Sequence, residues 1–275
     1  MYIEYSSNEF SSSPRAARRG RAVAAASPHS FQTAKEPEKY QLEPHFKKNK
    51  RKFFIYSFMD NQKTINKVAK EVKRTLKDVG AGHDWWHVYR VWKIAKHIGK
   101  KESANMFVVE LSALLHDIAD WKFHKGDDTI GPKIARKILS KHKVSENVVD
   151  YVCDIIATIA FKGAGVKTKM KTIEGKIVQD ADRLDAIGAI GIGRAFAYGG
   201  HKNRPMYDPN KKPVLHRSKE EYFKSESPTI NHFYEKLLLL KDRMNTKTAK
   251  EIAQKRHKFM KVYLDRFFKE WEGKL

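Results

Sequence analysis

Three short polar runs interrupt otherwise apolar stretches of the sequence, and their residue types are those of metal chemistry. The first holds two histidines and an arginine, the second a His-Asp pair with a further acid, and the third three acids and an arginine; they span residues 83–90, 116–120 and 180–185. Carboxylates and imidazoles buried among apolar side chains are costly unless they are paired or bind a cation. One divalent ion shared by the three runs would satisfy all of them, so the sequence favours a metal site.

The stretches that carry these runs have apolar residues at every third or fourth position, the spacing of amphipathic α-helices. Such stretches cover residues 60–79, 88–99, 104–118, 130–138, 148–159, 173–197, 229–243 and 246–271. The stretch at 104–118 is apolar on almost every side, as in a central buried helix. Convincing period-two alternation, typical of strands, is absent from the sequence. We therefore predict an all-α fold, with one helical domain over residues 59–275 that ends in two long helices at about 229–243 and 246–271.

Residues 1–58 have a different character. They contain serine runs, an arginine cluster at 15–21 and an alanine run at 22–26, with little periodicity up to residue 52. Such a composition is typical of disorder, so we expect a disordered basic leader. Two alternatives stay open for this segment. It could be an organelle-targeting segment, because no acid lies between Phe10 and Ala34, or the protein could start at Met59.

The composition narrows the class of protein and its partners. The chain has 275 residues, one cysteine (Cys153) and a formal net charge of +23. A single cysteine excludes a disulfide framework and fits a reducing compartment, and no stretch approaches the roughly 20 apolar residues of a membrane span. We expect a cytoplasmic protein without a membrane partner. The positive charge attracts anionic partners, which include phosphorylated small molecules such as nucleotides as well as nucleic acid.

Four strings in this order resemble one known family. They read GHDWWHVYRVW, LLHDIAD, EGKIVQDADRLDAIGAIGIGRAFAYGGHKNRPMYDP and TINHFYEKLLLLKDRMNTKTA, and they begin at residues 82, 114, 174 and 229. The pattern is similar to that of the HD superfamily of metal-dependent phosphohydrolases, and within it to a subgroup of stand-alone bacterial HD-domain hydrolases. The resemblance covers about residues 60–272 and implies an all-α HD domain.

The resemblance also implies the metal ligands. They are His87, His116, Asp117 and Asp182, with Asp180 as the rival for the last position. Two imidazoles and two carboxylates leave two positions of an octahedral ion open to water or substrate. This donor set suits manganese first, with magnesium, cobalt, nickel or iron as alternatives, better than it suits a closed tetrahedral zinc site.

Further polar residues near these strings are expected to assist catalysis. Asp120 and Asp185 lie about one helical turn from the ligands and are expected to orient a histidine or the attacking water. Arg183 and Lys122 are expected to stabilise charge on phosphoryl oxygens, acting with Asp117 and Asp120.

Substrate contacts are expected from basic residues around the site. We expect residues 198–205 to form a loop that supplies three of them. The expected substrate-binding residues are Arg90, His124, Lys125, His201, Lys202 and Arg204. Trp85, Trp86 and Trp92 are expected in the core rather than as platforms for a nucleotide base.

The reaction implied by the resemblance is hydrolysis of a nucleoside triphosphate. A metal-bound water would attack the α-phosphorus and release pyrophosphate and the nucleoside monophosphate. Two alternatives remain open. One is a phosphodiesterase or phosphomonoesterase that acts on another nucleotide, and the other is a basic nucleic-acid-binding protein whose metal site is structural.

Overall fold

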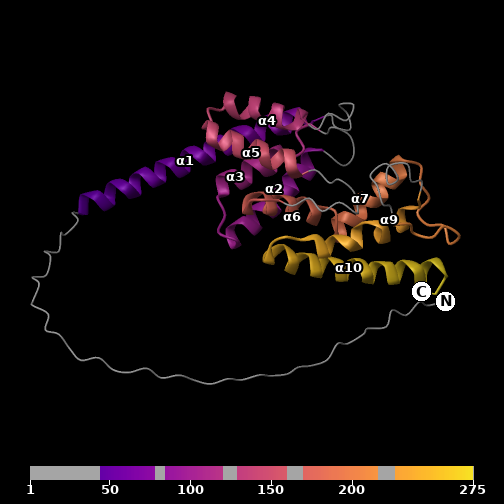
Figure 1. The fold of residues 1–275 in the computed structure, drawn as a ribbon. Coiled ribbons are helices and arrows are strands. Elements are labelled where there is room, and N and C mark those ends of the chain that lie inside the picture. Colours follow the sequence, from indigo (N-terminus) through magenta and orange to yellow (C-terminus); the bar gives the residue numbers. More distant parts are fainter. Residues whose placement is uncertain (1–43, 78–83, 120–128, 160–169, 216–226, 275) are drawn as a thin grey trace, which may run out of the picture. The chain divides into compact units, whose positions relative to one another are not determined.

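Every regular element in the described part of the chain is a helix, which confirms the predicted all-α fold (Figure 1). The computed structural model describes residues 44–77, 84–119, 129–159, 170–215 and 227–274, with side chains from residue 59 onward. The elements are α1 (Pro44–Thr75), α2 (Trp85–Lys101), α3 (Met106–Leu115), α4 (Ile130–Lys141), α5 (Glu146–Ile159), α6 (Ile173–Asp185), α7 (Gly188–His201), α9 (Thr229–Glu235), the 3₁₀ helix η2 (Leu237–Arg243) and α10 (Lys247–Trp271). Among these described helices, none combines the length and apolar character needed to cross a lipid bilayer.

Helices α2 and α3 lie at the centre of the molecule, because each contributes to two hydrophobic clusters. Val108 and Leu111 of α3 pack in a cluster with α1, α4 and α5. Val109 and Ala113, on the other side of α3, pack in a cluster with α6, α7, α9, η2 and α10. Helix α2 contacts both α3 and α6. The two central helices therefore bring together the three predicted polar runs, which lie at the start of α2, at the end of α3 and on α6.

Side-chain caps define where these helices start. The carboxylate of Asp84 accepts a hydrogen bond from the backbone N–H of His87 at 2.8 Å, so α2 begins at Trp85, two residues before a predicted ligand. Asn105, Thr172 and Thr246 cap α3, α6 and α10 in the same way. Such caps satisfy backbone N–H groups that have no partner within the helix.

The predicted single helix at 173–197 is wrong: the structure has two helices there, α6 and α7. The amide of Ala186 bonds to the carbonyl of Arg183, which closes α6. Gly188 follows with a φ of +80°, a left-handed conformation that favours glycine. A Cβ at this position would also lie 3.0 Å from the side chain of Arg256. Ile187, whose backbone is extended (φ −128°, ψ 163°), therefore separates α7 from α6.

The predicted loop at 198–205 is helical in its first part, because α7 continues to His201. Gly199 lies within this last turn, and a Cβ there would come within 2.1 Å of Thr229 Oγ1 on α9. The glycines of this segment therefore do not mark a loop. Gly199 permits the close approach of α7 to α9.

The predicted α-helix at 229–243 is also two elements. Lys236, with φ −145° and ψ −56°, separates the short helix α9 from η2. Leu237 and Leu240 are buried, whereas the two leucines between them are partly exposed. Three residues per turn place positions 237 and 240 on the same face, so burial of these two leucines suits a 3₁₀ helix.

Helix α1 starts at Pro44, earlier than the residue 60 indicated by the sequence pattern. Residues 44–58, which the sequence assigns to the leader, are thus the first part of this helix. Residues 1–43 lie outside the described residues. The domain boundary after residue 58 stays a prediction.

Candidate metal centre

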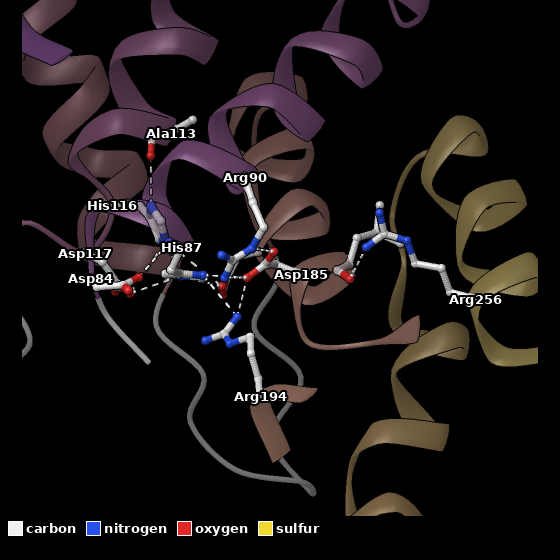
Figure 2. Close-up of polar contacts among 11 residues, drawn as sticks. Asp84, His87, Arg90, Ala113, His116, Asp117, Asp185, Arg194 and Arg256 are labelled. Carbon is white, nitrogen blue, oxygen red and sulfur yellow. Dashed lines mark hydrogen bonds and ion pairs between the residues drawn. The ribbon is translucent and has the colours of Figure 1, made fainter. Parts of the chain in front are cut away.

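Four predicted ligand side chains meet where α2, α3 and α6 come together. Figure 2 shows three of them, His87, His116 and Asp117. Nε2 of His87 lies 3.3 Å from Nε2 of His116 and 3.3 Å from a carboxylate oxygen of Asp117. An oxygen of Asp182 lies 3.5 Å from His87 Nε2 and 4.0 Å from His116 Nε2. His87, His116 and Asp117 alone already have the spacing of a metal-binding group.

Nδ1 of each histidine forms a hydrogen bond within the protein. Nδ1 of His116 lies 2.9 Å from the carbonyl oxygen of Ala113 and must donate its proton there. Nδ1 of His87 lies 2.8 Å from the carboxylate of Asp185, an acceptor, so it also carries a proton. In the neutral imidazoles, each Nε2 therefore has a lone pair that points toward the other ligands. A divalent cation fits this set of two nitrogens and two carboxylates.

Without a metal, the charge of the cluster acts on His87. Burial by itself lowers the pKa of His87, but hydrogen bonds to Asp117 and Asp185 and electrostatic attraction from Asp117 and Asp182 outweigh it. The pKa of His87 therefore rises to about 9. A buried imidazole that holds a proton this strongly lies in a negative environment, as expected where a cation binds.

The carboxylate of Asp185 forms a hydrogen bond with Nδ1 of His87 and also binds two arginines (Figure 2). Arg90 of α2 donates from Nε at 2.7 Å and from Nη2 at 3.0 Å to the Asp185 carboxylate. Arg194 of α7 forms an ion pair with the same carboxylate. Burial raises the pKa of Asp185, but these partners outweigh it and hold the pKa well below its usual range. We call Arg90, Asp185 and Arg194 the carboxylate clamp.

Sequence reasoning missed Arg194. The residue follows Asp185 by nine positions, and one continuous helix over 173–197 would have placed Arg194 about 13 Å further along the axis. The break at Gly188 brings it back to the site. A signal was present in the glycine that precedes the second apolar run, but a helix break cannot be distinguished from a tolerated glycine by pattern alone.

Asp180, the rival for the last ligand position, has another role. Its carboxylate accepts hydrogen bonds from the backbone N–H groups of Asn245 and Thr246, both at 2.8 Å. The hydroxyl of Thr246 donates a further bond at 2.9 Å. The side chain is fully buried, and burial raises its pKa despite these bonds. Asp180 therefore fixes the start of α10, and the geometry favours Asp182 as the fourth ligand.

The other predicted site residues make contacts elsewhere or lie outside the described part. The guanidinium of Arg183 donates a hydrogen bond to the backbone carbonyl of Arg243. Lys202 and Arg204 follow α7, and their charged groups lie 5.9 and 5.8 Å from the ring centre of Tyr198. His201 is exposed at the end of α7. The predicted catalytic and substrate residues that lie outside the described residues are Asp120, Lys122, His124 and Lys125.

The three tryptophans differ from one another. Trp85 and Trp92 pack against the core as predicted, but Trp86 is 58% exposed, so its core assignment is wrong. Position 86 precedes the buried Val88 by two residues, and two helical steps turn a side chain by about 200°. Trp86 therefore points away from the bundle.

Comparison with known proteins agrees with this geometry. Residues 85–187 match the HD domain family. YpgQ from Bacillus subtilis is 39% identical over 218 residues, which cover 78% of this chain and 97% of YpgQ. The crystal structure of an HD-superfamily hydrolase from Bacillus thuringiensis has 43% identity and a TM-score of 0.62, covering 77% of this chain and 98% of that one. The crystal structure of YpgQ in complex with ADP matches with 36% identity and a TM-score of 0.61, covering 77% and 96% of the two chains.

The matched region contains all four residues that meet at the junction of α2, α3 and α6, and the similarity to YpgQ extends over nearly the whole of that relative. By its sequence, its all-α fold and its His-His-Asp cluster, the chain belongs to the HD superfamily of metal-dependent hydrolases.

Proposed function

We propose that the protein hydrolyses nucleoside triphosphates to nucleoside monophosphates and pyrophosphate in the cytoplasm. The observation that carries the proposal is the convergence of two imidazole Nε2 atoms, 3.3 Å apart, with two carboxylates whose oxygens lie 3.3–4.0 Å from these nitrogens. The relative YpgQ has been crystallised with ADP, which supports a nucleotide as the ligand class.

A divalent ion held by His87, His116, Asp117 and Asp182 would polarise a phosphoryl oxygen and make a water molecule acidic enough to act as a nucleophile near neutral pH. We propose manganese, because a mixed nitrogen and oxygen set with open positions suits an octahedral ion of intermediate softness. Asp182 has a side chain that is 39% exposed, so the open side of the site adjoins solvent near this residue.

The carboxylate clamp supplies positive charge next to the ligands. Two guanidinium groups face one carboxylate, so Arg90, Asp185 and Arg194 together carry a net charge of +1. The side chains of Arg90 and Arg194 are 30% and 28% exposed, whereas that of Asp185 is 1% exposed. The clamp can therefore present N–H groups to a phosphate while Asp185 keeps His87 in place.

The end of α7 offers further contacts for a nucleotide. Tyr198 lies one helical turn beyond Arg194, is 43% exposed, and has the charged groups of Lys202 and Arg204 near its ring. Residues four apart share one face of a helix, so Arg194 and Tyr198 point in similar directions. We propose that the α-phosphate lies near the clamp and that Tyr198, Lys202 and Arg204 contact the outer part of the substrate.

The reaction can be tested with a panel of nucleoside triphosphates in ¹⁸O-labelled water, with Mn²⁺, Mg²⁺, Co²⁺ or Ni²⁺ supplied in turn. We expect pyrophosphate as a product and ¹⁸O in the nucleoside monophosphate, because attack at the α-phosphorus transfers the solvent oxygen to it. Label in orthophosphate alone would mean cleavage at the γ-phosphorus. No turnover of any nucleotide by metal-loaded protein would contradict the proposal and favour a different phosphate ester.

A matched pair of variants connects the reaction with the site. Asp117→Asn removes a proposed ligand and should abolish both metal retention and turnover. Asp154→Asn changes an exposed aspartate on α5 and should leave both unchanged. Turnover that persists in Asp117→Asn at the wild-type rate would contradict the ligand assignment.

A further inference from the structure

Helix α1 carries a row of positive charge on its outer face. Lys63, Lys67, Lys70 and Arg74 are spaced by four, three and four residues, and all four are exposed. At 100° per residue these side chains fall within about 60° around the helix axis, and the row is about 17 Å long. We call these four residues the basic stripe. The stripe lies opposite the apolar side chains of α1, which are buried in the core at positions 65, 68, 69, 72 and 76.

Helix α1 has few acids to balance the basic stripe: they are Asp60, three residues before Lys63, and Glu71. The carboxylate of Glu71 is bound to α4 and the residue after it, accepting from Lys141 Nζ at 2.9 Å and lying 2.7 Å from His142 Nε2. Like charges three or four residues apart destabilise a helix. The repulsion within the stripe therefore works against the stability of α1.

An aromatic surface adjoins the same helix. Nζ of Lys73 lies 6.0 Å from the ring centre of Trp85 and 5.9 Å from that of Trp86. Trp86 is 58% exposed and makes an edge contact with Tyr89, whose ring centre is 5.8 Å from Lys93 Nζ. Exposed aromatic rings between lysines are typical of surfaces that bind single-stranded nucleic acid, where cations follow the backbone and bases stack on rings.

We propose that the basic stripe and Trp86 form a binding surface for single-stranded nucleic acid, with the phosphate backbone along α1 and a base on Trp86. An anionic membrane fits less well, because a helix that lies in a membrane interface needs an exposed apolar face. The apolar face of α1 is buried in the core. The surface includes none of the four proposed metal ligands, so the inference goes beyond nucleotide hydrolysis and does not depend on it.

The test is fluorescence anisotropy with a labelled 20-nucleotide oligodeoxythymidine and the full chain. One variant replaces the four stripe residues by glutamine (K63Q/K67Q/K70Q/R74Q). The matched control removes four exposed lysines of α10 (K250Q/K255Q/K258Q/K261Q) and so has the same net charge. Circular dichroism and thermal unfolding verify that both variants are folded.

We expect the stripe variant to lose at least tenfold in affinity at 50 mM salt, and the control to change by less than about threefold. The slope of log K against log salt should become shallower by up to about 3 in the stripe variant, because each phosphate contact on a single strand contributes about 0.7. Trp86→Ala should weaken binding at least about fivefold and leave the salt slope unchanged, because stacking releases no counterions.

Equal losses in the stripe variant and its control would overturn the proposal, because binding would then depend on total charge alone. Wild-type affinity in Trp86→Ala would overturn the stacking role. Tight, stripe-dependent binding to phosphatidylserine vesicles without binding to the oligonucleotide would replace nucleic acid by a membrane as the partner. Nucleotide hydrolysis is no part of these measurements, so its failure would not affect this proposal.

Discussion

Replacement of Asp185 by asparagine tests whether the carboxylate clamp positions a metal ligand. The substitution keeps the shape of the side chain and removes its charge. Asp185 accepts the Nδ1 proton of His87 at 2.8 Å and binds Arg90 and Arg194 while being 1% exposed. With the charge removed, His87 loses the partner that fixes its orientation, and two arginines face each other without a carboxylate between them.

These contacts predict the size of two effects of the substitution, a loss of metal affinity and a loss of stability. Loss of a residue that orients a metal-binding histidine reduces metal affinity about 10- to 100-fold, or about 1.4–2.7 kcal/mol. Removal of one member of a buried ion pair costs about 3–5 kcal/mol in stability. The side chains of Arg90 and Arg194 are 30% and 28% exposed and can regain water, so we expect the lower end, about 3 kcal/mol.

Competition between protons and the metal for His87 makes the expected loss of metal affinity depend on pH. The pKa of His87 is about 9, and it should fall when the charge of Asp185 is removed. Less competition from protons then offsets part of the loss at pH 7. Titrations with Mn²⁺ at pH 7, 8 and 9, under nitrogen, should therefore show the largest loss at pH 9. Urea unfolding of the metal-free proteins gives the change in stability separately.

Asp182→Asn is the matched control for these measurements. Its side chain is 39% exposed, so the substitution should cost less than about 1 kcal/mol in stability. As a proposed direct ligand, Asp182 should nevertheless be needed for metal binding at every pH. If Asp185→Asn binds Mn²⁺ like the wild type at pH 9 and unfolds at the same urea concentration, the argument from the clamp is refuted.

Four further predictions concern the metal centre and the stability of the domain. Because a metal must displace the proton of His87 below its pKa of about 9, calorimetry in buffers of different ionisation enthalpy should show about one proton released per Mn²⁺ at pH 7. Stability that the metal-free protein gains from this proton is fully present below about pH 6.5 and should be lost as the pH rises through 9. Asp180→Ala leaves buried N–H groups of Asn245 and Thr246 without an acceptor and should cost about 3 kcal/mol in urea unfolding, while metal analysis finds unchanged content. A chain that begins at Met59 should keep its melting temperature within about 2 °C, since Ile65 is the first core side chain among the described side chains of α1; a larger loss would show that residues before 59 contribute to the domain.

The local pattern of the sequence was sufficient for the fold class and for the three polar runs that contain the proposed site. Apolar residues three and four apart identify helices without reference to their neighbours in space. The same pattern marks the polar residues that interrupt buried faces. The choice of His87, His116 and Asp117 as ligands within these runs followed from the resemblance to the HD superfamily.

Tertiary structure decided the features that depend on which helix faces which. Asp180 and Asp182 are two positions apart on α6, about 200° around the axis, and only the packing of α10 shows that Asp180 binds its N-terminus. Arg194 reaches Asp185 because the chain turns at Gly188. A glycine inside an apolar run is compatible with both a continuous helix and a break, and the contact with Arg256 selects the break.

Tertiary packing also decided the exposure of Trp86 and the 3₁₀ geometry of Leu237–Leu240. Both sequences are apolar enough for burial, and only the available space in the core determines which side chains enter it. Periodicity is a property of one segment and is visible in the sequence. Pairing between segments depends on the free energy of the whole packed core, so it becomes visible only in the folded chain.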